Sequence, residues 1–223
     1  MYSLTMARPS RNLDQVLLAA GRELLPQRGC AGLSVREVAE RAGVNLGMFH
    51  YHFRTREVFL RAVLQQAYEE MFATLRLEAD RGAPPVEGLR AALRVLGRFL
   101  RDNRPLLARV FADALGGEAC AREFIRDNLP RNVAVLRRMY LAGRRGGALR
   151  AVAFEQALGL LAVALALPIL AGGTIAASGM VGEARRRSLE RTLLTDAAID
   201  ERIDLALAGL AQPAPRRKER RSA

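Results

Sequence analysis

The chain has 223 residues, half of them apolar, and its 35 basic and 23 acidic residues give a net charge of +12. This length suffices for a small head and a larger body with a buried core, and the charge favours nucleic acid or an anionic surface as partner. The two cysteines, Cys30 and Cys120, have no paired spacing, and the chain opens without a basic, long apolar signal, which argues against a secreted protein and for a reducing cytoplasm.

The first two predicted helices are short and clearly bounded. The first is amphipathic and ends at Gly29, with apolar positions at Leu13, Val16, Leu17, Ala20 and Leu24. The second follows Ser34, because Ser34 and Glu37 have the spacing of a capping box. Gly43 ends it, since a helix C-terminus favours a residue that adopts a left-handed conformation without steric cost.

The next helix begins after Asn45, a good N-cap, and the turn residue Val44 is expected to pack between the two helices. Phe49 and Phe53 are four residues apart and can turn inward together. The outer face would then carry Leu46, Gly47, Met48, His50, Tyr51 and His52. Two short helices joined by a tight turn predict a helix-turn-helix over residues 34–53, whose exposed second helix suits a DNA major groove.

Arginines cluster around this element. Thr55 is expected to be the N-cap of a long helix that runs to about Ala79, and Arg54 and Arg56 flank this cap. Together with the free amides of the helix start they predict a phosphate site, and Arg36 predicts another. A solvated surface charge is an equally good interpretation for any one arginine alone, but the clustering favours phosphate binding.

These residues resemble the DNA-binding domain of the TetR/AcrR family of bacterial transcriptional regulators, from about Arg11 to Met71. The resemblance rests on the amphipathic first helix, on Gly32-Leu-Ser-Val-Arg, on Ala39 through Val44, on the aromatic block and on Phe53-Arg-Thr-Arg-Glu57. Asn45 stands in place of the usual turn serine, Met48 where threonine is common and His50 where a phosphate-binding tyrosine is usual. The resemblance implies that Arg36, His50 and Arg56 meet phosphates and that Leu46, Gly47, Met48, Tyr51 and His52 face base edges. Ser34, Asn45 and Arg54 complete the predicted DNA-binding set.

Catalysis and metal binding are not expected. His50 and His52 are one residue apart on a helix, so their imidazoles diverge, and no acidic or thiol partner lies near them. The chain has no phosphate-binding glycine loop, metal cluster or nucleophile elbow, so we expect no enzyme activity and no cofactor. Cys30 and Cys120 are expected to be inert thiols, with a redox switch as the alternative.

Beyond Met71 the sequence predicts helices throughout. The expected spans are Val86–Asp102, Leu106–Leu115, Glu118–Leu141 with Pro130 as kink or boundary, Ala151–Ala171, a piece between Val181 and Leu194, and Asp196–Ala211. An uncharged run over residues 156–182 is long enough to cross a bilayer. Because Pro168, Gly172 and Gly173 interrupt it and alanine dominates it, we expect a helix buried on several sides and no membrane partner.

The pattern as a whole predicts an all-α protein. We expect an N-terminal three-helix helix-turn-helix DNA-binding domain over residues 11–71, a larger helical C-terminal ligand-binding and dimerisation domain over 72–212, and a disordered basic tail over 213–223. By the resemblance, the helices at 151–171 and 196–211 pair with those of a second copy, the latter through a stripe of Ile199, Ile203, Ala206, Leu207 and Leu210.

The resemblance also implies a pocket for a small hydrophobic effector in the body. Candidate lining residues are Tyr68, Met71, Phe72, Phe99, Phe111, Phe124, Met139 and Tyr140, and ordinary core packing is the alternative interpretation for each. We therefore expect a cytoplasmic, homodimeric repressor that this effector releases from an inverted-repeat operator in double-stranded DNA. The alternative is a nonspecific basic DNA-binding or membrane-surface protein, for which charge alone suffices.

Overall fold

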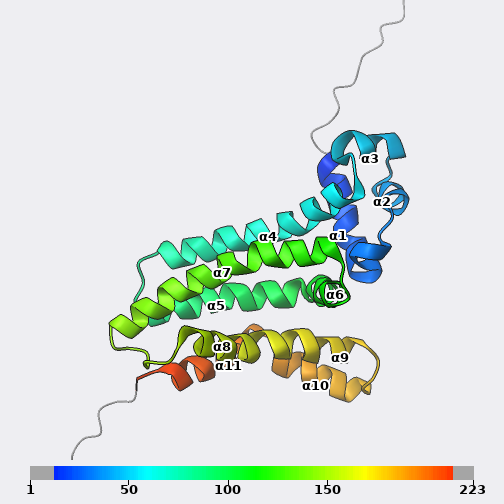
Figure 1. Ribbon diagram of the computed structural model, residues 1–223. Helices are drawn as coiled ribbons and strands as arrows, with labels where there is room; N and C mark the ends of the chain where they lie inside the picture. Colours follow the sequence, from blue (N-terminus) through cyan, green and yellow to red (C-terminus); the bar gives the residue numbers. More distant parts are fainter. Residues whose placement is uncertain (1–12, 213–223) are drawn as a thin grey trace, which may run out of the picture. The chain divides into compact units, whose positions relative to one another are not determined.

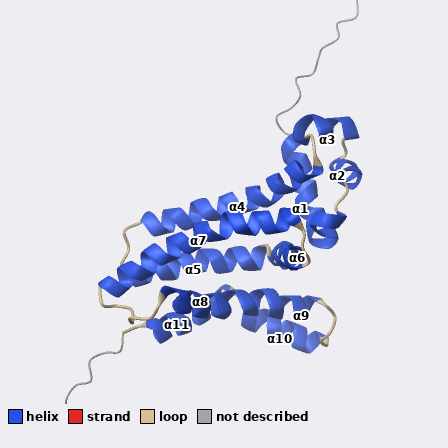
Figure 2. Cartoon of the chain, in the orientation of Figure 1, coloured by secondary structure: helices blue, strands red, loops and turns tan. Residues whose placement is uncertain are grey.

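The computed structural model describes residues 13–212, and these form helices and no β-strand (Figures 1 and 2). The helices are α1 Leu13–Gly32, α2 Val35–Ala42, α3 Leu46–Phe53, α4 Arg56–Asp80, α5 Pro85–Asp102, α6 Arg104–Leu115, α7 Ala119–Arg145, α8 Phe154–Leu167, α9 Gly173–Ala177, α10 Glu183–Leu194 and α11 Asp196–Leu210, with a π-helical turn at Pro168–Gly172 between α8 and α9. The all-α prediction is confirmed. Arg11 and the predicted basic tail at 213–223 lie outside the described residues.

The helix boundaries follow the local signals closely. Pro130 lies inside α7, which continues to Arg145, so this proline is not a boundary. The helix predicted from Ala151 begins at Phe154, and after the π-helical turn at Pro168 the helical path continues to Ala177. Proline has no backbone N–H to donate, which accounts for a change of helical hydrogen bonding at this point.

The described residues form two compact units. The first contains residues 13–73 and 102–131, and the second contains residues 74–101 and 132–212. The sequence placed residues 102–131 with the body, whereas in the structure α6 packs along α1. The boundary predicted between residues 71 and 72 stays a prediction, because compact packing alone does not define a domain.

The first unit has a dense core built from α1, α3, α4, α6 and α7. Its fully buried members include Leu17, Leu25, Phe49, Phe59 and Leu60, and α6 and α7 add Leu106, Val110 and Ala121. At Gly21 a Cβ atom would lie 2.5 Å from the Phe59 ring and 2.9 Å from Val63. Glycine at this position therefore allows α1 and α4 to approach closely.

The second unit packs α11 against α5 and α8. Gly97 of α5 makes room for Ile199, whose Cγ2 would lie 2.8 Å from an added Cβ. Ion pairs border this contact, with Arg90 Nε 2.7 Å from Asp204 and Arg94 Nε 2.8 Å from Asp200. The predicted α11 stripe is buried: Ile199, Ile203, Ala206, Leu207 and Leu210. This stripe packs within the chain, so the expectation that it faces a second copy is wrong.

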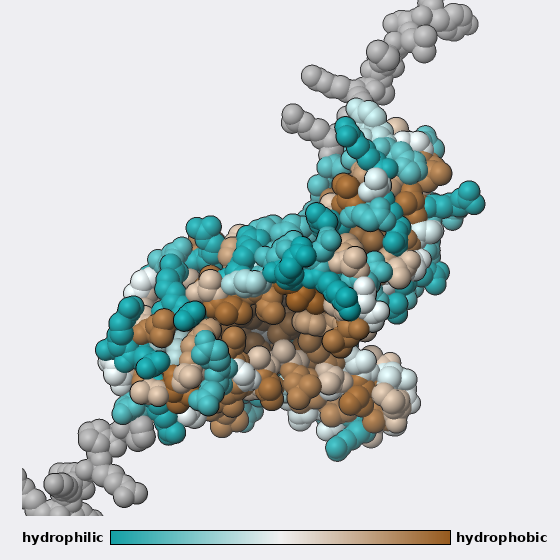
Figure 3. All heavy atoms as spheres, viewed as in Figure 1, coloured by the Kyte–Doolittle hydropathy of each residue, from teal (hydrophilic) through white to brown (hydrophobic). Residues whose placement is uncertain are grey.

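The stretch from Phe154 to Ala177 is apolar but largely uncovered. Only 28% of its most apolar window is buried, so the expectation of a helix buried on several sides is wrong for the single chain. Its exposed apolar side chains are Leu160, Val163, Leu167 and Ile175. Figure 3 shows apolar side chains on the surface of the region that holds α8 and α9. This stretch is long and apolar enough to cross a membrane. A single helix of this kind is weak evidence for a membrane protein.

Candidate nucleic-acid interface

The helix-turn-helix forms where the sequence predicted it. Ser34 adopts an extended conformation and its hydroxyl accepts a hydrogen bond from the Glu37 amide at 3.1 Å. Gly43 is left-handed, with φ of 67°, and the Val44 amide donates to Ala39 O at 3.0 Å. The structure differs at the Glu37 carboxylate, which pairs with Arg28 Nε at 2.7 Å and so ties α2 to α1. The Ser34 half of the predicted capping box is therefore present, while the Glu37 side chain has a different partner.

The second helix of the pair, α3, is fixed from inside and at its start. Asn45 Oδ1 accepts a hydrogen bond from the Met48 amide at 2.9 Å, which confirms the predicted N-cap. Val44 packs against the core of the first unit, as expected. Phe49 and Phe53 are buried, with ring centroids 5.7 Å apart, and both rings lie 5.0 Å from the ring of Phe59 in α4. This ring cluster sets which face of α3 is directed outward.

The outward face of α3 carries most of the predicted base-facing residues. Tyr51 is 68% exposed and Leu46 is 41% exposed. Also exposed are Ser34, Arg36, Asn45, Gly47, His50 and Arg54. Met48 and His52 are half-buried. The Nε2 atom of His52 is buried and has no hydrogen-bond partner among the described residues. His52 is therefore poorly placed to offer that nitrogen to a base edge, and its predicted role stays untested.

The end of α3 is strained. Arg54 has φ of 56° and ψ of −55°, and the Thr55 amide donates to Phe53 O, which makes Arg54 the centre of a γ-turn with positive φ. Such turns are rare for residues other than glycine. His50 Nδ1 lies 3.2 Å from Arg54 O, and this contact is a hydrogen bond in the tautomer that carries its proton on Nδ1. The strained turn thus presents the Arg54 side chain and the other edge of His50 to solvent.

Arg56 has a different environment from the one expected. Its guanidinium donates to the carbonyl of Cys30, to Ala31 O at 3.2 Å and to Leu33 O at 3.4 Å. These carbonyls close the end of α1, so Arg56 holds α1 to the start of α4 and is only 29% exposed. The geometry supports a structural role for Arg56, and it does not support the predicted phosphate contact.

The start of α4 carries a negative charge of its own. The backbone amide of Glu57, the Thr55 hydroxyl and the Arg56 guanidinium all lower the pKa of the Glu57 carboxyl. The Thr55 hydroxyl also accepts from the Val58 amide at 3.2 Å, which confirms the predicted N-cap. An ionised carboxylate at this helix N-terminus competes with a phosphate for the same amides, so α4 is a weaker phosphate site than the sequence suggested.

One buried carboxylate, which the sequence analysis missed, joins α6 to the end of α1. Asp113 of α6 is 9% exposed and accepts from the Cys30 amide at 2.6 Å and from Arg109 Nε at 2.9 Å. Next to Cys30, Gly29 has φ of 72°, and an added Cβ there would lie 2.3 Å from the Arg109 side chain. A polar residue on a mostly apolar helix was the only local signal. Its partner lies 83 positions away in the chain.

The predicted effector residues divide between the two units. Tyr68, Met71, Phe72, Phe111 and Phe124 belong to the first unit, and Phe99, Met139 and Tyr140 belong to the second. In the first unit Tyr68 stacks on Phe72 with a 5.6 Å centroid separation, and the Arg131 guanidinium lies 4.1 Å from the Phe72 centroid. Burial raises the pKa of the Tyr68 phenol to about 12. Phe111 is 41% exposed, so it is not part of this cluster's buried packing.

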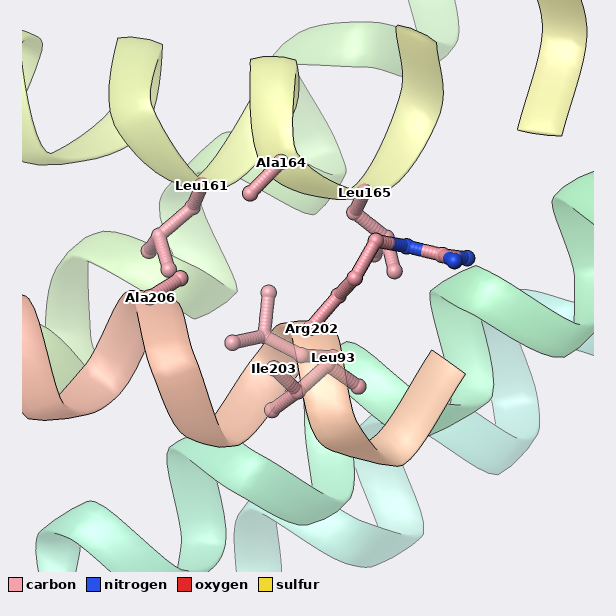
Figure 4. Close-up of a pocket in the computed structure, with 7 residues that line it drawn as sticks. All are labelled: Leu93, Leu161, Ala164, Leu165, Arg202, Ile203 and Ala206. Atoms are coloured by element: carbon pink, nitrogen blue, oxygen red, sulfur yellow. The ribbon is translucent and has the colours of Figure 1, made fainter. Parts of the chain in front are cut away.

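Two gaps in the second unit are lined by other residues. Figure 4 shows the first, which lies between α5, α8 and α11 and is too narrow for a water molecule. Its lining residues are Leu93, Leu161, Ala164, Leu165, Arg202, Ile203 and Ala206. The second is an open hollow of about 300 Å³ beside the α7–α8 connection, lined by Leu141, Arg144, Arg145, Leu149 and Ala151. Neither gap contains any of the predicted effector residues. Within residues 13–212 no group of three or more His, Cys, Asp or Glu side chains could hold a metal ion.

Part of the chain is similar in sequence to known bacterial regulators. The family described as "Bacterial regulatory proteins, tetR family" matches residues 17–63, which span α1 to the first part of α4. The HTH-type transcriptional repressor Rv3405c of Mycobacterium tuberculosis is 34% identical over 94 residues, 40% of this chain and 47% of that protein. CymR of Pseudomonas putida, an HTH-type transcriptional regulator, is 26% identical over 61% of this chain and 68% of its own length.

The similarity in fold extends over most of the chain. The TetR family transcriptional regulator PfmR of Thermus thermophilus superposes with a TM-score of 0.63 at 20% identity, covering 86% of this chain and 97% of that one. At that identity the likeness concerns the fold alone. The chain spans about half the length of the curated repressor that it matches at 34% identity.

Proposed function

We propose that the chain is a sequence-specific DNA-binding transcriptional regulator of the TetR type, since its residues 17–63 match the TetR family of bacterial regulatory proteins. In this proposal it is a homodimeric repressor that binds an inverted-repeat operator in double-stranded DNA in the cytoplasm. A small hydrophobic effector releases it. The observation that carries the proposal is the exposed face of α3, which is capped by Asn45 and oriented by the Phe49, Phe53 and Phe59 rings.

The contacts to DNA are assigned from this geometry. Tyr51 and Leu46 are the exposed large hydrophobic side chains of α3 and are proposed to reach base edges together with Gly47. Arg36 and Arg54 are exposed cations at the two ends of the helix-turn-helix and are proposed to meet phosphates. Arg56 is proposed to act indirectly, by holding the end of α1 against the start of α4.

A second copy of the chain is proposed to cover α8. Leu160, Val163 and Leu167 recur at helical spacing and stay exposed in the single chain, as does Leu205 on the neighbouring α11. A stripe of this kind is typical of a surface that is buried in a symmetric dimer. Two recognition helices held in this way read two half-sites about one helical turn apart, which is why the operator is proposed to be an inverted repeat.

The effector is proposed to bind the aromatic cluster around Tyr68, Phe72 and Phe124, which offers apolar faces and one phenol. Binding of effector and operator should then be coupled reciprocally by about 1–3 kcal/mol. Screening compounds for a rise in Tm and for loss of the DNA complex tests this part. A compound that binds the cluster and leaves operator affinity unchanged would remove the release step from the proposal.

The decisive experiment is a binding titration on DNA from upstream of the gene, with excess random competitor, at two salt concentrations. We expect a competitor-resistant complex that binds at least about a thousandfold more tightly than bulk DNA. Tyr51→Ala should weaken it by tenfold or more, while Leu115→Ala, an 86% exposed apolar residue on α6, should leave it unchanged. If excess competitor also abolished binding to fragments taken from the whole genome, nonspecific binding through charge would be favoured.

A further inference from the structure

An open hollow of about 300 Å³ lies beside the connection between α7 and α8, within the second unit. Its lining residues are Leu141, Arg144, Arg145, Leu149 and Ala151, and we refer to it as the α7–α8 hollow. Its volume lies at the small end of the range for pockets that hold small organic ligands, roughly 300–1,000 Å³. Three of its lining side chains are apolar and two are cationic, so both an apolar and an anionic group of a ligand would find a partner there.

Hydrogen bonds along the connection fix the walls of the α7–α8 hollow. Past the end of α7 the chain folds back, and the Leu149 amide donates to Gly143 O at 3.2 Å. Further along the connection, Val152 O accepts from the Tyr140 hydroxyl at 3.1 Å and from the Arg144 guanidinium at 3.2 Å. These bonds hold both ends of the connection against α7. The hollow is therefore a preformed feature of the fold, and a ligand would not have to order its walls.

The charge around the α7–α8 hollow has one sign. Residues 137–153 contain five arginines and no acidic residue. Among residues 13–212, only Arg138 of these five has an ion pair, with Asp80 at 2.8 Å. Arg144 uses one N–H group on Val152 O, and Arg145 has no hydrogen bond or ion pair in the same part of the chain. Because a guanidinium has five N–H donors, both lining arginines keep donors for a ligand, and the surrounding charge favours an anion.

We propose that the α7–α8 hollow binds a small organic carboxylate, which Arg144 and Arg145 hold by its carboxylate group while its apolar part lies against Leu141, Leu149 and Ala151. The planar guanidinium suits this group because its N–H donors match the two oxygens of a carboxylate. The apolar lining favours a carboxylate that carries a hydrocarbon chain or ring, since burying that part removes apolar surface from water. The site is separate from the aromatic cluster proposed to bind the effector, which belongs to the first unit. The proposal stands independently of the proposed DNA-binding function.

The test is a titration of the full-length protein with sodium hexanoate at constant ionic strength, followed by methyl NMR. We expect saturable shifts of the Leu141, Leu149 and Ala151 methyl signals, with a Kd on the order of 1 mM or tighter. Acetate has the charge without the chain, and 1-hexanol has the chain without the charge, so each should bind at least about tenfold more weakly. Equal binding of acetate would assign the affinity to charge alone, and equal binding of hexanol would assign it to apolar burial alone. Either result, or the absence of saturable shifts at these methyl groups, would overturn the proposal.

Two variants separate the arginines from the hollow itself. The double variant Arg144→Gln/Arg145→Gln should bind hexanoate at least about tenfold more weakly, because it loses both cations. Ala151→Trp keeps both arginines and fills the hollow, and Ala151 is exposed, so this variant should also lose binding without disturbing the core. The control is Arg185→Gln, an exposed arginine of α10 in the same unit, which should bind like the wild type. Loss of binding in the arginine variant with full binding in Ala151→Trp would place the anion outside the hollow and overturn the proposal.

Discussion

Asp113 gives the sharpest test of how the first unit is held together. Its carboxylate accepts from the Cys30 amide at 2.6 Å and from Arg109 Nε at 2.9 Å, and its side chain is 7% exposed. Asp113→Ala leaves the buried Cys30 amide without a partner, which costs about 1–3 kcal/mol. The pair with Arg109, whose side chain is 40% exposed, adds roughly 0.5–1 kcal/mol after solvent screening. The free energy of unfolding should therefore fall by about 2–4 kcal/mol.

Urea denaturation followed by circular dichroism measures this loss. A chain of this size should also show a fall in Tm of roughly 5–15 °C. Asp113→Asn keeps an oxygen acceptor for the Cys30 amide and should lose about 1 kcal/mol. The control is Asp127→Ala. Asp127 is 58% exposed and, among residues 13–212, forms its ion pair with its neighbour Arg126 at the surface, so its loss should cost less than about 0.5 kcal/mol. If Asp113→Ala matched Asp127→Ala in stability, the buried carboxylate would not be what fastens α6 to α1.

Three further predictions concern the turn, the dimer and the phenol. In urea denaturation the Arg54→Gly variant should be about 1 kcal/mol more stable than Arg54→Ala, because only glycine adopts φ of 56° without strain. Equal stabilities of the two variants would argue against strain in this turn. Val163→Asp on the exposed face of α8 should give monomers by sedimentation and weaken operator binding, while Leu77→Asp, equally accessible on α4, should stay dimeric. The pKa of Tyr68 is raised to about 12 in the folded protein. Its contribution to the free energy of unfolding, up to about 2 kcal/mol, is therefore present below pH 10 and lost between pH 10 and 12. Tyr68→Phe should lack that alkaline loss, and an identical alkaline transition in the variant would assign it to other groups.

Much of the helix-turn-helix could be predicted because its signals are local. Ser34, Gly43 and Asn45 each act through hydrogen bonds or backbone angles within a few residues, and all three have the predicted roles. The inward turn of Phe49 and Phe53 follows from their spacing alone. A helix with caps and an apolar period carries enough information in its own residues to specify where it starts, where it ends and which face it buries.

The sequence by itself therefore determined the helices, the turn and the exposed second helix of the helix-turn-helix. The tertiary structure decided which groups meet across long separations: Arg56 with the end of α1, and Asp113 with Cys30. It also decided that the α11 stripe is buried within the chain while the α8 face stays exposed. These outcomes depend on how separate helices pack, and packing partners tens of residues apart leave no periodic or capping signal in either segment.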